Sequence, residues 1–168
     1  MKHQQNRKEF SKLIEKNQRI IHKITSIYCN SGDDREDLFQ EICLQLWNSY
    51  GSFREDSKFS TWMYRVALNT AISNVRKKKN NFSFEPLNEY TRLPLESDDD
   101  KENVKLLYKA VSMLNSIDKA IILLWLEEKN YDEIASIIGT TKSNISVKLV
   151  RIKRKLEEIV NNTIKQES

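Results

Sequence analysis

The sequence predicts an all-α protein in which two small helical domains are joined by a flexible linker. Its 168 residues include only three glycines and two prolines, and alternating β-branched runs are scarce, so we do not expect a sheet. Apolar residues recur instead at three- and four-residue spacings on both sides of a polar stretch that lacks such a pattern. We therefore expect a first domain at 1–80, a linker at 81–101 and a second domain at 102–168.

The first domain should begin with two amphipathic helices. The apolar positions of the first helix are Phe10, Leu13, Ile14, Ile21, Ile24 and Tyr28. After the break at 30–32, Asp33 or Asp34 can cap a second helix, whose acidic first turn suits the positive end of the helix dipole. The apolar face of this second helix is formed by Leu38, Ile42 and Leu46.

A third helix should follow a polar loop at 53–59. Ser60 or Thr61 is its expected N-cap, and the helix ends in the basic run 76–79. Its apolar positions are Trp62, Val66, Leu68 and Ile72. Trp62 and Tyr64 could instead stack on nucleic-acid bases, although Trp62 fits the core better.

The stretch at 80–100 reads as a linker because it contains both prolines and no sustained apolar periodicity. The run Asp98 to Asp100 has the chemistry to bind a hard cation, but an unconstrained acidic linker fits it better. Paired cysteines, clustered histidines and nucleotide-binding glycine loops are absent from the sequence. We expect neither a metal site nor a cofactor.

The second domain should contain four helices, near 102–114, 117–126, 131–138 and 141–160. The last two have the mechanics of a helix-turn-helix, because Gly139 stands where a helix must end in a left-handed residue. Thr141 or Ser143 can cap the second helix of this pair. The inward positions are Ile134, Ala135, Ile138, Ile145, Leu149 and Ile152. The alternative is a plain helical hairpin with a basic face.

Charge is strongly segregated along the chain, although the net charge is only +4. Residues 57–84 hold six Lys or Arg and no acid, and residues 134–156 again hold six and no acid. The intervening segment 85–102 holds seven acids against two cations. Two basic segments joined by an acidic one indicate two contacts with one long anion, unless both are simply solvated helix faces.

The chain shows no signal for a membrane or an oxidising compartment. Residues 1–7 are polar, and no run approaches the roughly 18 apolar residues of a membrane span. Cys29 and Cys43 are too few for a disulfide framework and fit buried positions in helices. We expect a cytoplasmic protein that is not inserted in a membrane.

The segment from Asp34 to Lys77 resembles region two of the extracytoplasmic-function group of RNA polymerase sigma factors. That family has an acidic helix of the form D-x-E-D-L-x-Q-E-x-F, then a loop and a helix of the form F-x-x-W-L-Y-R-I-A-x-N. The chain departs from this pattern at Cys43, where an aromatic residue is usual, and at Met63, where leucine is usual. Residues 131–156 are similarly close to region four, so the resemblance covers most of the chain outside the linker and termini.

The resemblance implies three sets of functional residues. The acidic helix would dock on the clamp helices of the polymerase beta-prime subunit through Asp34, Glu36, Asp37, Gln40 and Glu41. The loop would capture a flipped base, and with the third helix it would read the minus-ten element through Arg54, Ser57, Lys58, Phe59, Arg65, Asn69, Ser73, Arg76 and Lys77. The helix-turn-helix would read the upstream element through Thr141, Lys142, Ser143, Asn144, Ser146, Lys148, Arg151 and Arg154.

These observations predict a bacterial sigma factor that brings core polymerase to promoter DNA and performs no catalysis itself. Its implied partners are the beta-prime clamp helices, the beta flap and promoter DNA, and many relatives are also held by an anti-sigma factor. We would expect it to be associated with the nucleoid. An autonomous helix-turn-helix regulator is the alternative, but it leaves the acidic helix and loop of the first domain unexplained. A nuclease that uses the acidic cluster is disfavoured, because the sequence lacks suitably spaced carboxylates.

Overall fold

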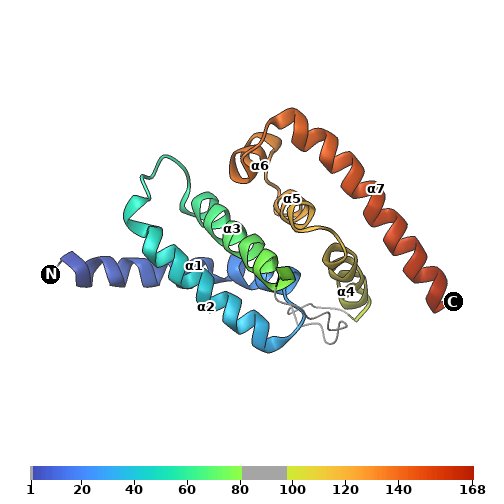
Figure 1. The fold of residues 1–168 in the computed structure, drawn as a ribbon, viewed down its shortest axis with the longest axis horizontal. Coiled ribbons are helices and arrows are strands. Elements are labelled where there is room, and N and C mark those ends of the chain that lie inside the picture. Colours follow the sequence, from blue (N-terminus) through green and yellow to red (C-terminus); the bar gives the residue numbers. More distant parts are fainter. Residues whose placement is uncertain (1, 81–97) are drawn as a thin grey trace. The chain divides into compact units, whose positions relative to one another are not determined.

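The computed structural model describes residues 2–80 and 98–168, and within these ranges all regular secondary structure is helical (Figure 1). The chain divides into two compact units, Met1–Glu89 and Tyr90–Ser168. The all-α class expected from the sequence is confirmed. Most of the predicted linker lies outside the described residues, and its last part, residues 98–101, belongs to a helix.

The first unit is built from α1 (Lys2–Tyr28), α2 (Gly32–Ser49) and α3 (Phe59–Asn80), with a short 3-10 helix at Tyr50–Ser52. The three long helices pack against one another in every pairing. Their shared core buries completely the residues Ile21, Ile24, Ile42, Leu46, Met63, Ala67 and Ala71. The apolar faces predicted for the first two helices are thereby confirmed over this core.

Both helix starts predicted in this unit are wrong by a few residues. Ser31, not Asp33 or Asp34, caps α2, because its backbone is extended and its hydroxyl accepts a hydrogen bond from the Asp34 N–H at 3.1 Å. The helix α3 begins at Phe59, where the Lys58 carbonyl accepts bonds from the backbone of the first turn. Ser60 and Thr61 therefore lie inside the helix rather than capping it.

The second unit contains α4 (Asp98–Ser112), α5 (Ser116–Leu126), α6 (Tyr131–Ile138) and α7 (Lys142–Glu167). The helix α4 starts four residues before the predicted position, as suits a run of acids at a helix N-terminus. The core of this unit is lined by Ile121, Leu124, Ile134, Ile145 and Leu149. The apolar helix α5 contributes five consecutive buried residues, so it forms the centre of this unit.

Both cysteines carry free thiols. Cys29 is buried just after the end of α1, whereas Cys43 on α2 is only half-buried, so the expectation of burial holds fully for Cys29 alone. Burial still raises the pKa of the Cys43 thiol. Within the ranges that the structure describes, no helix is both long and apolar enough to cross a membrane.

Candidate nucleic-acid interface

The helix-turn-helix of the second unit is fixed by three local backbone devices. Asn130 and Glu133 form a reciprocal capping box at the start of α6, with hydrogen bonds of 2.9 and 3.0 Å. Gly139 ends α6 in the left-handed region at φ 82°, and its N–H donates to the Ala135 carbonyl at 2.9 Å. The Thr141 hydroxyl then caps α7 by accepting from the Asn144 N–H at 3.2 Å. A three-residue turn therefore joins the two helices.

The buried stripe of α7 sets which of its side chains face outward. Ile145, Leu149 and Ile152 are buried as predicted, and Leu156 continues the stripe. In α6 the inward residues are Ile134, Ala135 and Ile137, while Ile138 is only half-buried. Among the residues predicted to bind the upstream element, Ser146 is half-buried and the exposed ones are Thr141, Lys142, Ser143, Asn144, Lys148, Arg151 and Arg154.

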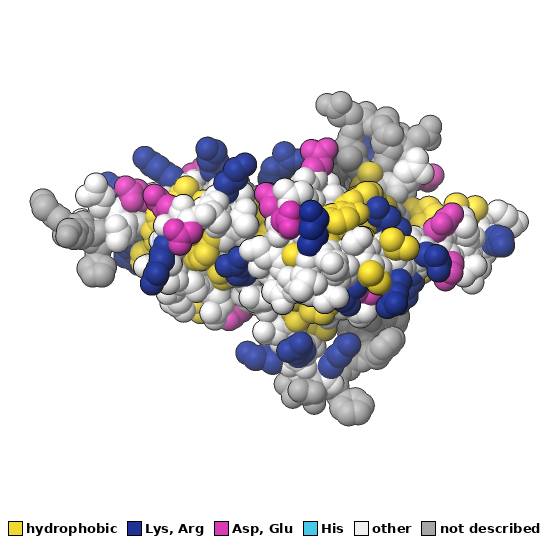
Figure 2. All heavy atoms as spheres, turned by 90° about the horizontal axis from the view of Figure 1, so that it is seen from above, with side chains coloured by type: hydrophobic (Ala, Val, Ile, Leu, Met, Phe, Trp, Pro, Cys, Tyr) yellow, Lys and Arg dark blue, Asp and Glu magenta, His cyan; other side chains and the backbone are white. Residues whose placement is uncertain are grey.

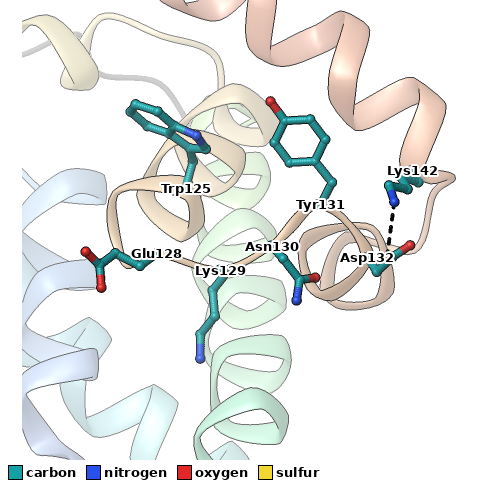
Figure 3. Close-up of a pocket in the computed structure, with 7 residues that line it drawn as sticks. All are labelled: Trp125, Glu128, Lys129, Asn130, Tyr131, Asp132 and Lys142. Carbon is teal, nitrogen blue, oxygen red and sulfur yellow. Dashed lines mark hydrogen bonds and ion pairs between the residues drawn. The ribbon is translucent and has the colours of Figure 1, made fainter.

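Two of the predicted base-reading side chains have partners within the protein. The Lys142 ammonium lies 3.4 Å from the Asp132 carboxylate, and the Asn144 amide donates to the Thr140 hydroxyl at 3.1 Å. Figure 3 shows Lys142 reaching Asp132 at the edge of an open pocket of about 540 Å³, where the Trp125 ring also lies. These contacts are exposed, so they are weak and can be exchanged for contacts with DNA.

One cation of the acid-free segment 134–156 contacts an aromatic ring of its own unit. The Lys153 ammonium lies 4.0 Å from the centre of the Trp125 ring, so a cation–π contact links α7 to the end of α5. Arg151 and Arg154, both predicted to bind the upstream element, are exposed on α7 with Lys155.

In the first unit an aromatic cluster holds the loop between the 3-10 helix and α3. The rings of Phe53, Phe59 and Trp62 contact one another with centroid separations of 5.2 to 5.6 Å. All three side chains are half-buried, so both phenylalanines are anchors and Trp62 is only partly core. The polar residues Arg54, Ser57 and Lys58 are exposed between these anchors. The polar side chains of the loop are therefore exposed, while the packed aromatic rings hold the two ends of the loop.

The residues of α3 that were predicted to read the minus-ten element form a polar stripe on one exposed face. Arg65, Asn69, Ser73 and Arg76 are all exposed, and at about 100° per residue they share one side of the helix. Tyr64 is only 2% exposed, so its ring is part of the core and cannot stack on a base. Lys77 is also exposed where the stripe meets the basic end of the helix.

The acidic set on α2 divides into two groups. Asp34 accepts a hydrogen bond of 2.8 Å from Lys78, which holds the pKa of its carboxyl below the ordinary value. Glu41 is half-buried and accepts from the Gln45 amide at 2.9 Å. The acidic and amide side chains that remain exposed are Glu36, Asp37 and Gln40.

The exposed apolar side chains that the sequence reasoning missed include three near predicted contact residues of α2 and α7. Leu44 is 51% exposed and follows Asp37 and Gln40 at helical spacing on α2. Val147 and Val150 are 52% and 58% exposed on α7. The exposure of the two valines could have been predicted from the sequence, because both fall between the regularly spaced residues of the buried stripe.

Comparison with known proteins matches both units to one family. Residues 13–81 match sigma-70 region 2, and residues 105–156 match sigma-70 region 4. The chain is 29% identical over 171 residues to the ECF RNA polymerase sigma-E factor of Escherichia coli (strain K12), which covers 91% of this chain and 89% of that protein. It is 27% identical over 70 residues to the ECF RNA polymerase sigma factor SigM of Mycobacterium tuberculosis (strain Erdman), covering 42% of this chain and 36% of the relative.

Two solved structures share the fold. The sigma factor RpoE in complex with the anti-sigma factor NepR from Bartonella quintana has a TM-score of 0.73 at 21% identity, covering 92% of this chain and 98% of that one. CnrH in complex with the cytosolic domain of CnrY has a TM-score of 0.66 at 15% identity, covering 93% and 90%.

Fold and site together define a helical DNA-binding protein made of two compact units. The chain belongs to the sigma-70 family, in the extracytoplasmic-function group of RNA polymerase sigma factors. Such proteins are transcription initiation factors. The region 2 match accounts for the first unit, which the alternative of an autonomous regulator does not explain.

Proposed function

We propose that this sigma factor docks on core RNA polymerase through α2 and reads promoter DNA at two separate places. The observation that carries the proposal is the placement of charge. An acidic face on α2 shares its unit with the exposed stripe of α3. In the other unit, the acid-free segment 134–156 includes the N-terminal part of the recognition helix α7. The acidic face of α2 suits a positively charged partner, and the two basic surfaces suit a negatively charged one.

Docking to polymerase is assigned to the outward face of α2. Asp37 and Gln40 are exposed there, and Leu44 adds an apolar contact one turn further along. Such a surface suits a basic partner that also carries apolar side chains, as expected of the beta-prime clamp helices. Asp34 is assigned a smaller part in docking, because Lys78 already neutralises it.

Promoter opening is assigned to the loop at 53–59 and to α3. The aromatic cluster of Phe53, Phe59 and Trp62 holds the loop, so its exposed polar groups can close on an unstacked base without first becoming ordered. Favourable contacts to that base offset the few kcal/mol of unpairing. Asn69 and Arg76, on the exposed stripe, would follow the same single strand.

The upstream element is assigned to α7. Lys142, Ser143 and Asn144 stand at its exposed N-terminal turn, which in helix-turn-helix proteins enters the major groove. Arg151 and Arg154 lie further along the helix and suit phosphates. The region 4 unit is also expected to contact the beta flap of polymerase.

No catalytic step or cofactor is assigned to this chain, because polymerase supplies the chemistry of transcription. Two proteins that share its fold were solved with a bound anti-sigma factor or a cytosolic partner domain. We extend the proposal to a partner of that kind, which would hold the factor until it is released. The same proposal places the protein in the cytoplasm with the nucleoid, where polymerase acts.

The decisive experiment reconstitutes the full chain with core polymerase from the bacterium that encodes it. We expect the chain to co-purify with core subunits and to direct transcription from duplex start sites that core alone ignores. Mapping of the transcripts should reveal shared sequences at two positions upstream of the start. Sequence-specific DNA binding without core, together with no new start site, would establish an autonomous regulator instead.

A further inference from the structure

The recognition helix α7 carries two exposed valines in the middle of its outward face. Val147 and Val150 are 52% and 58% exposed, although the residues buried from this helix nearby are Ile145, Leu149 and Ile152. At about 100° per residue, both valines point away from that stripe, on the same side as Ser143 and Arg154. They therefore lie inside the surface assigned to DNA rather than at the edge of the core.

Helix stability does not explain these two side chains. Valine is β-branched and loses side-chain freedom in a helix, so it is a poorer choice at an exposed helical site than lysine, glutamate or alanine. The core does not explain them either, because the buried stripe of α7 is complete without them. Burial against an external partner would account for both exposed valines.

The surroundings of the valines indicate which partner this is. No acid occurs between residues 134 and 156, and Arg151 and Arg154 are exposed one helical turn after Val147 and Val150. In Figure 2, dark blue Lys and Arg side chains are interspersed with yellow hydrophobic ones over the part of the face where α7 lies. A small apolar contact set among cations suits a polyanion that carries apolar groups of its own.

Duplex DNA has one such group in the major groove, the C5 methyl of thymine. We propose that Val147 and Val150 select the upstream element by packing on thymine methyl groups. This inference rests on the proposed function, since it needs α7 to lie in the major groove of that element. It adds two specificity-determining residues to a face otherwise made of hydrogen-bonding and charged groups.

The test compares deoxythymidine with deoxyuridine, which differs from it only by lacking the C5 methyl group of the base. Holoenzyme made from the full chain and core polymerase first selects duplexes from a library with a randomised upstream region. Each thymine of the selected element is then replaced in turn by deoxyuridine, and holoenzyme binding is measured. We expect at least one replacement to weaken binding roughly fourfold, the effect of losing one buried methyl group.

Variants then assign that loss to the valines. Val147→Ser and Val150→Ser should each bind thymine and deoxyuridine duplexes alike at the position that the valine contacts. The matched control is Ile164→Ser, because Ile164 is 50% exposed on the same helix but lies beyond the face assigned to DNA. The control should keep the full preference for thymine.

Two results would overturn the inference while leaving the proposed function intact. One is a selected element at which deoxyuridine is tolerated everywhere. The other is a valine variant that binds core polymerase more weakly but still discriminates thymine from deoxyuridine, since that would make the valines a protein contact. Failure of the holoenzyme to select any upstream sequence would instead refute the assignment of α7 to DNA.

Discussion

The carboxylate of Asp34 accepts a hydrogen bond of 2.8 Å from the ammonium of Lys78, which joins the first turn of α2 to the last turns of α3. Each charge also suits its own helix end, an acid at an N-terminus and a cation at a C-terminus. Asp34 belongs to the set assigned to polymerase, and Lys78 follows the residues assigned to DNA. The pair therefore links two surfaces within one unit.

This ion pair should make stability depend on pH in a defined direction. The hydrogen bond from Lys78 is the main cause that lowers the pKa of Asp34 below 3.8, so the unfolded chain takes up the proton first as the pH falls. The stabilisation is thus complete above about pH 5 and is lost as the pH falls through the lowered pKa. Because both side chains are about half exposed, Asp34→Asn should cost at most about 1 kcal/mol at pH 7.

A double-mutant cycle with Lys78→Ala, followed by urea unfolding between pH 2 and 7, measures this contribution. The effect of Asp34→Asn should shrink at low pH and should largely vanish in the Lys78→Ala background. If Asp34→Asn instead had the same pH-dependent effect on stability in the Lys78→Ala background, Lys78 would not be the group that lowers the pKa of Asp34.

Charge reversal on α2 should weaken the complex with core polymerase. Replacing Asp37 and Glu41 with lysine removes attraction to a basic surface and adds repulsion, so we expect an affinity loss of roughly tenfold or more. The control reverses Glu9 and Glu15, which are exposed acids on α1. Circular dichroism should show unchanged helicity for both proteins, and equal affinity of the two for core would refute the docking assignment.

Substitutions on α7 should separate phosphate contacts from base contacts. Arg154→Ala should weaken holoenzyme binding across all upstream sequences and reduce the salt slope by about one unit, because one phosphate contact is lost. Asn144→Ala should instead cost roughly 1–3 kcal/mol at particular base pairs. Binding titrations over a series of salt concentrations and single-base variants check both outcomes. If both substitutions relaxed specificity alike, this division of the helix would be wrong.

The loop and α3 should act on promoter opening more than on initial binding. A double substitution of Ser57 and Lys58 by alanine, or Asn69→Ala, should leave duplex binding by holoenzyme within a few fold. The reason is that base capture contributes only after unpairing, while upstream duplex contacts come from the other unit. Permanganate reactivity of thymines near the start site should fall sharply.

Templates that are already melted through the minus-ten element provide the control. Transcription from them should recover much of the activity that the loop and Asn69 variants lose on duplex DNA. The rescue should also depend on the non-template sequence, because the loop reads a base. Equal defects on duplex and pre-melted templates would assign these residues to general DNA affinity.

Much of the fold and part of the site follow from local chemistry. The helix at Tyr131–Ile138 has the predicted bounds, because Asn130 caps it and Gly139 adopts the left-handed conformation that ends it. The start of α2 was misplaced for a related reason. Several neighbouring residues have side chains that can cap a helix, and the extended backbone at Ser31 decided which of them does.

The sequence by itself determined the helical class, the buried stripes and the acid-free segments, because these depend on residue type and on spacing along one helix. Only the tertiary structure decided which side chains meet across helices. It paired Asp34 with Lys78, placed Lys153 on the ring of Trp125, and set Phe10 against Trp47 with ring centres 5.1 Å apart. Each of these contacts joins residues at least 28 positions apart in the chain, a relation that depends on how helices pack and not on any local period.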